Sequence, residues 1–353
     1  MDRGAGALVR RPRILLLGHY PLEPRDRAPV VRTWAMADAL ARRASVTALS
    51  GTRGDRAAFV RGFLAAGGLG QVDGVYLEAG TSTMTLADHT LLQAIRRRGL
   101  PLGIYIRDAY QRFPELYPPT NLKEWAMARA YALTTWRYRQ LATVLFFPTD
   151  GLRDLFPHPA RQLLPPAGTV AAPPPGAARH PHRVVYVGAN GPYDGVDTAV
   201  AAMTLVSRRH PDAELVLVTR PSEAPRERSP VCRVVTAAGE ALDPWLWSSA
   251  LALVPRRDTA YTRLALPIKL FDYLSHGLPV IATGPSETSK LVVAAGVGIP
   301  VPPDPGRVAE AILSLWARPE RLAAMSAAAL HLVAEHHNWD ARAQQVLSAL
   351  GFV

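Results

Sequence analysis

The chain has 353 residues but only one cysteine, Cys232, and only three lysines, which are Lys123, Lys269 and Lys290. A single cysteine cannot form an internal disulfide, and it cannot supply a cysteine-based zinc site. Long apolar runs are also absent: none approaches the roughly 20 residues that a helix needs to span a bilayer, and the first residues lack the apolar core of a signal peptide. These absences predict a cytoplasmic protein.

Charge is distributed unevenly along the chain. The formal net charge is +11, and 48% of the residues are hydrophobic, which is ordinary for a soluble globular protein. Residues 1–165 hold 23 Lys and Arg against 13 Asp and Glu, whereas residues 166–353 hold 17 against 16. A general preference for arginine explains why lysine is rare, but it does not explain this asymmetry.

The basic half is therefore expected to meet an anionic partner. Candidates are lipid headgroups on the inner face of the membrane, a lipid-linked phosphorylated acceptor, and nucleic acid. The last is the least favoured, because the sequence has no recognised nucleic-acid-binding motif.

Strand-like and helix-like segments alternate along both halves, which predicts the α/β class with parallel sheets covered by helices. A chain of 353 residues fits two domains. A proline-rich stretch without periodicity, residues 165–182, separates the two series. We expect an N-terminal Rossmann-like domain over residues 1–164 and a C-terminal one over residues 183–353, whose closing helix can pack back on the first domain.

The most informative segment covers residues 266–283 and reads LPIKLFDYLSHGLPVIAT. Pro267 suits the first turn of a helix and Gly277 suits the position after its end, so the pattern predicts a short helix followed by a buried strand. Lys269 and Asp272 stand three residues apart and therefore share a helical face. The helix N-terminus and the lysine suit an anionic diphosphate, and the carboxylate suits a ribose diol. A plain surface Lys–Asp pair is the alternative reading.

This segment resembles the donor-site helix of retaining glycosyltransferases with the GT-B fold, the large family-four group, whose usual form is Pro-x-Lys-x-x-Glu-Tyr-x-x-x-Gly-x-Pro-Val-Val. The resemblance implies two Rossmann-like domains that face each other across a cleft. It also implies a hexosyltransferase-like enzyme that moves a sugar, with retention, from a nucleotide-diphosphate sugar to an acceptor such as a lipid-linked or cell-surface glycan precursor. The donor would contact Lys269, Asp272 and the helix entry at Leu266 and Pro267.

No metal cofactor is expected. A helix N-terminus and cationic side chains can stabilise a departing diphosphate without one. The sequence also shows no clustered set of histidine and aspartate residues. The nucleotide sugar is then a co-substrate, and no other cofactor is expected.

A glycine-rich turn, residues 188–195, follows a predicted strand and precedes a predicted helix, so its backbone can approach phosphates closely. The resemblance places it at the family's Gly-x-x-x-x-Lys-Gly turn and implies donor contacts at Asn190 and Gly191. Asp194 occupies the position where the family has lysine. The positive charge must then come from the donor helix and from Arg256, which follows another predicted strand.

A second departure concerns two family glutamates that stand eight positions apart. Asp272 matches the later one, whereas the earlier one falls on Leu264, whose side chain can neither ionise nor accept a hydrogen bond. The alternative function is therefore a non-catalytic nucleotide- or sugar-binding protein with a degenerate donor site.

Ligands of open parallel sheets gather at the carboxyl ends of the strands, so polar residues that follow predicted strands are candidates for the N-terminal part of the site. Asp108 follows a buried strand, and the resemblance implies a catalytic carboxylate or histidine in this region that faces the transferred sugar. A turn aspartate is the alternative. Four residues in this half are candidates for acceptor binding: His19, Arg32, Glu78 and Arg107.

The membrane hypothesis also has candidate residues. A helix predicted over residues 122–141 carries arginines and aromatic residues of the kind that settle at the level of lipid headgroups. The candidates are Arg53, Arg56 and Arg61 in one segment, with Arg129, Tyr131, Trp136, Arg137, Tyr138 and Arg139 on the helix. The alternative is that the aromatic residues pack inward and the arginines are merely solvated.

Overall fold

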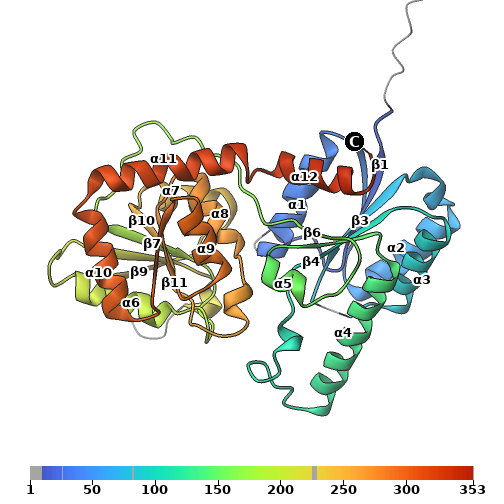
Figure 1. The fold of residues 1–353 in the computed structure, drawn as a ribbon, viewed down its shortest axis with the longest axis horizontal. Helices are drawn as coiled ribbons and strands as arrows, with labels where there is room; N and C mark the ends of the chain where they lie inside the picture. Colours follow the sequence, from blue (N-terminus) through green and yellow to red (C-terminus); the bar gives the residue numbers. More distant parts are fainter. Residues whose placement is uncertain (1–9, 26, 82, 225–228, 353) are drawn as a thin grey trace, which may run out of the picture.

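The computed structural model describes residues 10–25, 27–81, 83–224 and 229–352. These residues form two parallel six-stranded sheets, each with helices on both faces (Figure 1). Apolar residues of the strands point alternately into two cores per sheet, because both faces are covered. The two-domain α/β architecture predicted from the sequence is confirmed.

The first sheet has the strand order β2-β1-β3-β4-β5-β6, and all of its pairs are parallel. Its strands are β1 (Arg13–Gly18), β2 (Ser45–Ser50), β3 (Gly74–Ala79), β4 (Leu102–Ile106), β5 (Val144–Phe147) and β6 (Arg161–Leu163). Its helices are α1 (Ala28–Ala41), α2 (Arg53–Ala65), α3 (Leu86–Arg97), α4 (Leu122–Leu141) and α5 (Asp150–Asp154).

The second sheet has the strand order β12-β11-β10-β7-β8-β9, again with parallel pairs. Its strands are β7 (Arg183–Val187), β8 (Glu214–Val218), β9 (Cys232–Val235), β10 (Leu251–Val254), β11 (Val280–Thr283) and β12 (Gly298–Val301). The helices are α6 (Val196–Val206), α7 (Asp243–Trp247), α8 (Ile268–Ser275), α9 (Glu287–Ala294), α10 (Pro305–Trp316) and α11 (Pro319–Glu335).

The chain crosses between the domains twice. After α11 it returns to the first domain, where α12 (Trp339–Ala349) packs against α1 and joins the core beneath it (Figure 1). The two crossing segments run beside each other, because the Gly168 amide donates a hydrogen bond of 2.8 Å to the His337 carbonyl. The first domain is thus completed by the last helix of the chain.

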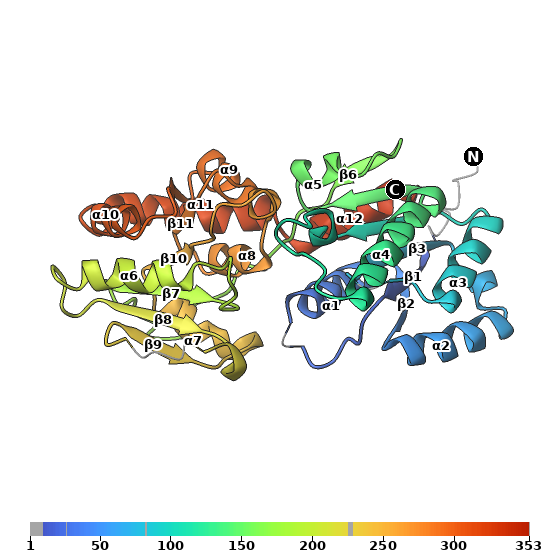
Figure 2. The same ribbon diagram turned by 90° about the horizontal axis from the view of Figure 1, so that it is seen from below.

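The donor helix predicted from the sequence is α8, and its ends differ slightly from expectation. Gly277 follows the helix with a φ of +62°, the left-handed conformation that the prediction required. Pro267 is not in the first turn but caps the helix, because its backbone is extended and its carbonyl accepts a hydrogen bond from the Leu270 amide. Helix α8 lies next to α1 of the first domain (Figure 2).

None of the helices in the described part of the chain is long and apolar enough to cross a membrane.

Candidate functional site

A cleft of about 830 Å³ lies between the two domains. The second domain presents the carboxyl ends of β7 and β10 to it, which are neighbours in the sheet although they are not consecutive in the chain. Such a reversal of strand order leaves a crevice where ligands of open α/β sheets bind. The first domain contributes a basic wall to the cleft, which includes Arg25, Arg27, Arg32 and Arg107.

Lys269 stands in the first turn of α8 and lines the cleft, although its side chain is only 9% exposed. Its amine lies 3.9 Å from the centre of the Tyr186 ring, and a Cβ placed on Gly188 would lie 2.8 Å from Nζ. Burial lowers the pKa of Lys269 to about 7, helped by the nearby Arg256 and opposed by Asp194. No ion pair or hydrogen bond to another described residue satisfies this amine, so an anion in the cleft would supply its missing partner.

Asp272 lies one turn further along α8 and also lines the cleft. Burial raises the pKa of its carboxyl to about 7, and the charge of Asp243 adds to this effect. Asp243 is itself held close by, because His276 contacts both the Asp243 carboxylate at 3.1 Å and the Asp272 carbonyl at 2.8 Å. A hydroxyl that donates to Asp272 would favour its charged form.

Five predicted donor residues meet in this part of the cleft. They are Arg256, Leu266, Pro267, Lys269 and Asp272. Arg256 follows β10, and its buried Nε has no hydrogen-bond partner in the described part of the chain. The helix entry and the end of a neighbouring strand are therefore brought together, as parallel topology requires.

The glycine-rich turn contributes different residues from those expected. Gly188 and Ala189 line the cleft, whereas Asn190 is exposed and neither it nor Gly191 is part of the lining. The reason is local: the Asp194 carboxylate accepts a hydrogen bond of 2.9 Å from the Gly191 amide and closes the turn on itself. Asp194 also lines the cleft, so a negative side chain stands where the resembled family has lysine.

The turn is packed tightly against the end of β10. Gly195 has a φ of +71°, and a Cβ on it would lie 1.7 Å from the Pro255 carbonyl oxygen. Only glycine fits this position, because both the conformation and the space exclude a side chain. The close approach keeps the turn beside Arg256.

Asp108 lines the cleft from the first domain, with both carboxylate oxygens engaged. Arg107 Nε donates to Oδ2 at 2.6 Å, and the Tyr261 hydroxyl donates to Oδ1 at 2.8 Å across the cleft. The Tyr131 hydroxyl fixes the Asp108 backbone by donating to its carbonyl. The carboxylate is thus oriented by two hydrogen bonds, its backbone is held by a third, and it reaches the second domain through Tyr261.

Arg32 forms the deepest part of the basic wall. Its guanidinium is buried, pairs with Glu78 at 3.2 Å and lies 3.7 Å above the Tyr105 ring. Its Nη1 atom and the Tyr105 hydroxyl have no hydrogen-bond partner among the described residues, although both side chains line the cleft. Two buried polar atoms at the wall of a cleft mark a place where a ligand's acceptor atoms would fit.

Two predicted acceptor-binding residues do not reach the cleft. His19 is buried, hydrogen-bonds the Tyr138 hydroxyl at 2.9 Å and lies 3.9 Å from Asp88, and burial lowers its pKa to about 4. Glu78 is buried beneath Arg32 and is held by the Tyr76 hydroxyl at 2.7 Å. Both expectations were wrong in placement, because strand-end residues also turn inward under the neighbouring helices.

Three features of the site escaped sequence reasoning. Tyr261 contacts Asp108, and Tyr186 contacts Lys269. Neither tyrosine stands in a recognisable sequence motif. Arg25 and Arg27 extend the basic wall, and the concentration of arginine after the first strand was a signal that could have identified them.

Comparison with known proteins places this geometry in context. Residues 181–318 match the family model described as "Glycosyl transferases group 1", which confirms the resemblance over that part of the chain. A comparison with curated proteins gave no match.

Solved structures of similar fold include GT-B glycosyltransferases. A sucrose-phosphate synthase from Thermosynechococcus elongatus aligns with a TM-score of 0.72 at 16% identity, over 96% of this chain and 98% of that one. WaaG, a glycosyltransferase involved in lipopolysaccharide biosynthesis, aligns with a TM-score of 0.67 at 14% identity, over 96% and 100% of the chains.

Anabaena HepE, solved in complex with UDP and glucose, aligns with a TM-score of 0.68 at 14% identity, over 96% of this chain and 99% of its own. These likenesses confirm the GT-B architecture predicted from the sequence.

Proposed function

We propose that the protein is a glycosyltransferase that moves a sugar from a nucleoside-diphosphate sugar to an acceptor in the interdomain cleft. The observation that carries this proposal is the buried Lys269 at the start of α8, which lines the cleft and has no ion pair or hydrogen bond from its amine to any other residue in the described part of the chain. The match of residues 181–318 to group 1 glycosyl transferases supports it, because that segment contains the whole of α8.

The diphosphate would lie at the N-terminus of α8. Backbone amides in the first turn of a helix have no intrahelical acceptor and favour an anion. Lys269 and Arg256 add two cationic groups beside them. A dianion would raise the pKa of Lys269 back toward its ordinary range and keep the amine protonated. The same groups would stabilise the charge that develops on the leaving diphosphate, so no metal cofactor is required.

The nucleoside would extend along α8, where Asp272 accepts hydrogen bonds from the ribose hydroxyls. The transferred sugar would then point toward the first domain and Asp108. This carboxylate has a fixed orientation from Arg107 and Tyr261. We assign it the role of contacting the sugar in the transition state. Retention of configuration is proposed on the likeness to the group 1 family.

The acceptor would enter along the basic wall of the first domain. Arg32 and Arg107 line it, and the buried Nη1 of Arg32 lacks a partner among the described residues. A phosphate or carboxylate on the acceptor would satisfy this donor and complement the net positive charge of residues 1–165. A lipid-linked phosphorylated acceptor would supply such a phosphate, and its lipid would hold it at a membrane surface.

Helix α4 presents an apolar face to solvent. Leu122, Trp125, Leu133 and Trp136 are 81%, 50%, 60% and 46% exposed, and their spacing places them on one side of the helix. Arg129 lies on the same side, 4.9 Å from the Trp125 ring. Exposed tryptophans beside arginines suit the headgroup region of an anionic membrane.

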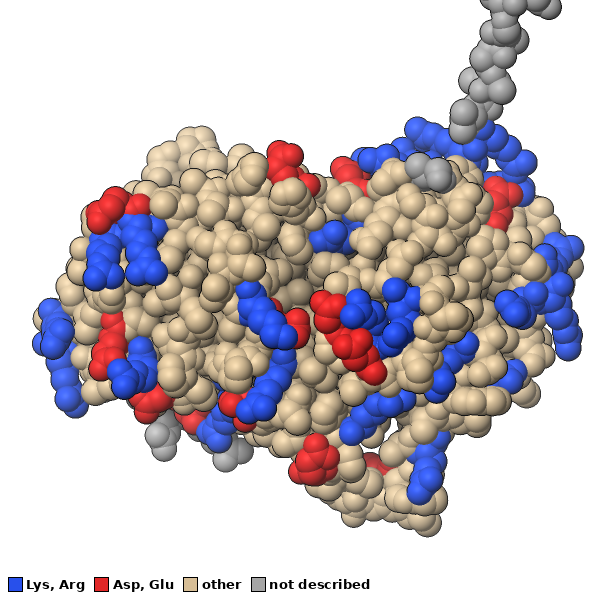
Figure 3. Space-filling view, viewed as in Figure 1, with Lys and Arg blue, Asp and Glu red and all other residues tan. Residues whose placement is uncertain are grey.

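The helix projects from the body of the first domain, as Figure 1 shows, and basic side chains surround its base and extend over the same domain (Figure 3). We therefore propose that this face of α4 rests on the inner membrane surface, so that the enzyme is a peripheral cytoplasmic protein. Three of the residues first considered for this surface point elsewhere. Tyr131 and Tyr138 lie on the buried side of α4. Arg56 is also buried, in an ion pair of 2.9 Å with Asp88.

A non-catalytic nucleotide- or sugar-binding protein is the second candidate. It is favoured by Asp194 and Leu264, which line the cleft in place of family residues that carry a positive and a negative charge. The two candidates share the donor site and differ in turnover.

The donor assignment predicts different effects for two variants. Lys269→Ala should weaken binding of a nucleoside diphosphate by about 1.5–3 kcal/mol, the loss expected for a hydrogen bond to a charged group. Asp272→Asn should weaken binding of the nucleoside diphosphate but leave inorganic pyrophosphate binding unchanged. Calorimetry would use whichever of UDP, GDP, ADP and dTDP raises the melting temperature most.

Lys290→Ala is the matched control, because this exposed lysine of the same domain pairs with Glu287 instead. For the wild-type protein the affinity should fall as the pH rises above about 7, since Lys269 must be protonated to attract the anion. Equal affinities for the wild type, Lys269→Ala and Lys290→Ala would remove the donor site from α8.

The role of Asp108 predicts a loss of turnover without a loss of donor affinity. Asp108→Asn should slow hydrolysis of the bound nucleotide sugar by about 100-fold, because the interaction acts mainly in the transition state. Release of nucleoside diphosphate measures this slow reaction when the acceptor is not known. Tyr261→Phe is the control, since it removes the cross-domain hydrogen bond but keeps the carboxylate. If both variants lose turnover equally, Asp108 acts only through the contact between the domains. If the wild-type protein binds the nucleotide sugar but never hydrolyses it, the non-catalytic candidate is favoured.

The membrane surface predicts a salt-dependent interaction. The wild type should sediment with vesicles containing anionic phosphatidylglycerol at low ionic strength, and less so at high ionic strength, because each arginine contributes about 1 kcal/mol near an anionic surface. Trp125→Ala combined with Trp136→Ala should release most of the bound protein. Val293→Ser, which changes an exposed apolar residue of the second domain, is the control. Negligible binding to anionic vesicles at low salt would leave a soluble acceptor as the better assignment.

A further inference from the structure

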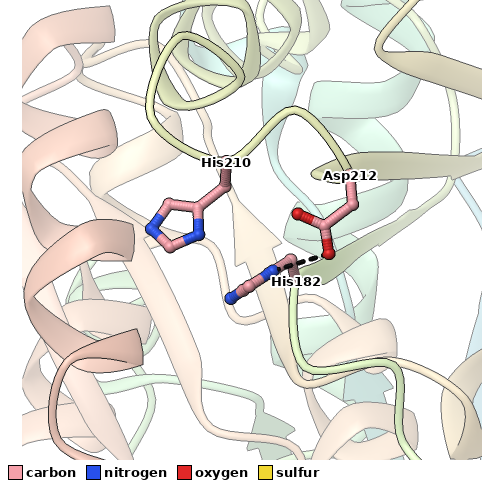
Figure 4. Close-up of side chains that lie close together, drawn as sticks. All are labelled: His182, His210 and Asp212. Carbon is pink, nitrogen blue, oxygen red and sulfur yellow. Dashed lines mark hydrogen bonds and ion pairs between the residues drawn. The ribbon is translucent and has the colours of Figure 1, made fainter.

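Three potential metal ligands lie together at the end of the second sheet opposite the cleft. His182 directly precedes β7, while His210 and Asp212 stand in the connection from α6 to β8 (Figure 4). The cleft is lined by Val187 and Gly188 at the other end of β7. A strand of five residues spans about 16 Å, so the cluster is separate from the proposed donor site.

The donor atoms of this cluster already converge. One ligand atom from each residue lies within 4.8 Å of the others. His182 Nδ1 is 2.8 Å from Asp212 Oδ2, and the His182 and His210 rings have centroids 4.2 Å apart. Figure 4 shows the His210 ring and the Asp212 carboxylate on either side of the His182 ring.

The backbone holds these side chains in place. The Glu214 amide donates to the His182 carbonyl at 3.1 Å, which ties the start of β7 to the start of β8. His210 is fixed in the same way, because its amide donates to the Val206 carbonyl and its carbonyl accepts from the Ala213 amide. A site on such anchored positions needs little reorganisation to bind a ligand.

A neighbouring aromatic side chain completes the surroundings. The Trp316 ring of α10 lies 4.8 Å from the His182 ring and 5.5 Å from the His210 ring. It restricts the rotation of both imidazoles. On the other side Asp212 is 55% exposed, so an ion can reach the cluster from solvent.

We propose that His182, His210 and Asp212 bind a divalent transition metal ion of the zinc class. Two imidazoles and one carboxylate form a donor set that suits Zn²⁺, whereas Mg²⁺ and Ca²⁺ prefer oxygen ligands alone. With bonds of about 2.0–2.2 Å, two tetrahedral ligands are separated by about 3.3 Å. His182 and Asp212 therefore need to move apart by only about 0.5 Å from their 2.8 Å contact.

The ion would take the place of the proton that His182 and Asp212 share, and a water molecule would complete the coordination on the exposed side. Because protons compete with the metal for imidazole nitrogens, affinity falls toward acid pH. The site would fasten the α6–β8 connection to the start of β7 and is not part of the transfer reaction. Sequence reasoning found no such cluster because His182 and Asp212 stand 30 positions apart.

The experiment titrates the metal-free protein with Zn²⁺ by calorimetry. We expect a single strong site in the wild type and a rise in melting temperature with Zn²⁺, since the ion binds only the folded state. His210→Ala and Asp212→Asn should each weaken this site by at least tenfold. The control is His331→Ala, which removes a histidine from a second ring pair, His331 and His336, whose centroids are 6.3 Å apart.

Co²⁺ provides an independent readout, because its visible spectrum reports the coordination number of the bound ion. The wild type should give a four- or five-coordinate spectrum that both cluster variants lose. Asp212 is exposed, so Asp212→Asn keeps the test valid if His210→Ala fails to fold. An affinity for Zn²⁺ that is the same in the wild type and Asp212→Asn, or that falls only in His331→Ala, would overturn the proposal, as would displacement of Zn²⁺ by equimolar Mg²⁺.

Discussion

The contact between Tyr261 and Asp108 is the interaction on which the geometry of the cleft depends. It joins a loop of the second domain to the carboxyl end of β4 in the first, at 2.8 Å. Aromatic rings from both domains surround it, with centroids 5.6–5.7 Å apart in edge-on arrangements. The rings are Tyr110, Phe113 and Tyr117 of the first domain and Tyr193 and Tyr261 of the second.

Each aromatic pair of this kind contributes about 0.5–1.5 kcal/mol beyond its buried area. The cluster, together with α12, therefore fixes how the donor wall of the cleft, which carries Arg256, Lys269 and Asp272, faces the basic wall of the first domain. The orientation of Asp108 is consequently a property of the assembled pair of domains and not of either domain alone.

The donor wall carries groups that oppose folding. The pKa of Lys269 is about 7 in the folded chain against an ordinary value of 10.5, so between these values the unfolded chain binds more protons and stability rises with pH. The pKa of Asp272 is raised to about 7 from 3.8, so its contribution has the opposite sign, and stability falls as the pH rises between those values. Around neutral pH both groups are costly to charge, and a ligand that pairs with them recovers that cost.

Much of the fold followed from local patterns. Helix α4, for example, has the ends predicted for it, at residues 122 and 141. Helix α2 was not predicted, although Thr52 and Asp55 form a capping box at its start that could have identified it. The short edge strands β6 and β9 were also missed, since exposed edges carry no continuous apolar pattern.

The site was only partly accessible from sequence. Helix α8 was predicted because its lysine, carboxylate and end residues lie within one segment. The inward turn of His19 and the cross-domain reach of Tyr261 depend on packing between distant elements, which periodicity does not encode. The departure at Asp194 was visible in the sequence, but its hydrogen bond to Gly191 and the resulting closure of the turn were not.

The central claim is that a nucleoside diphosphate binds between the glycine-rich turn and the start of α8. Hydrogen–deuterium exchange with and without the best-stabilising nucleoside diphosphate tests it most directly, because bound phosphates protect the backbone amides that contact them. We predict slower exchange in residues 188–195 and 266–272, with no change in β9 at the far edge of the same sheet. Unchanged exchange in both segments at saturating nucleotide, or protection confined to other parts of the chain, would contradict the account.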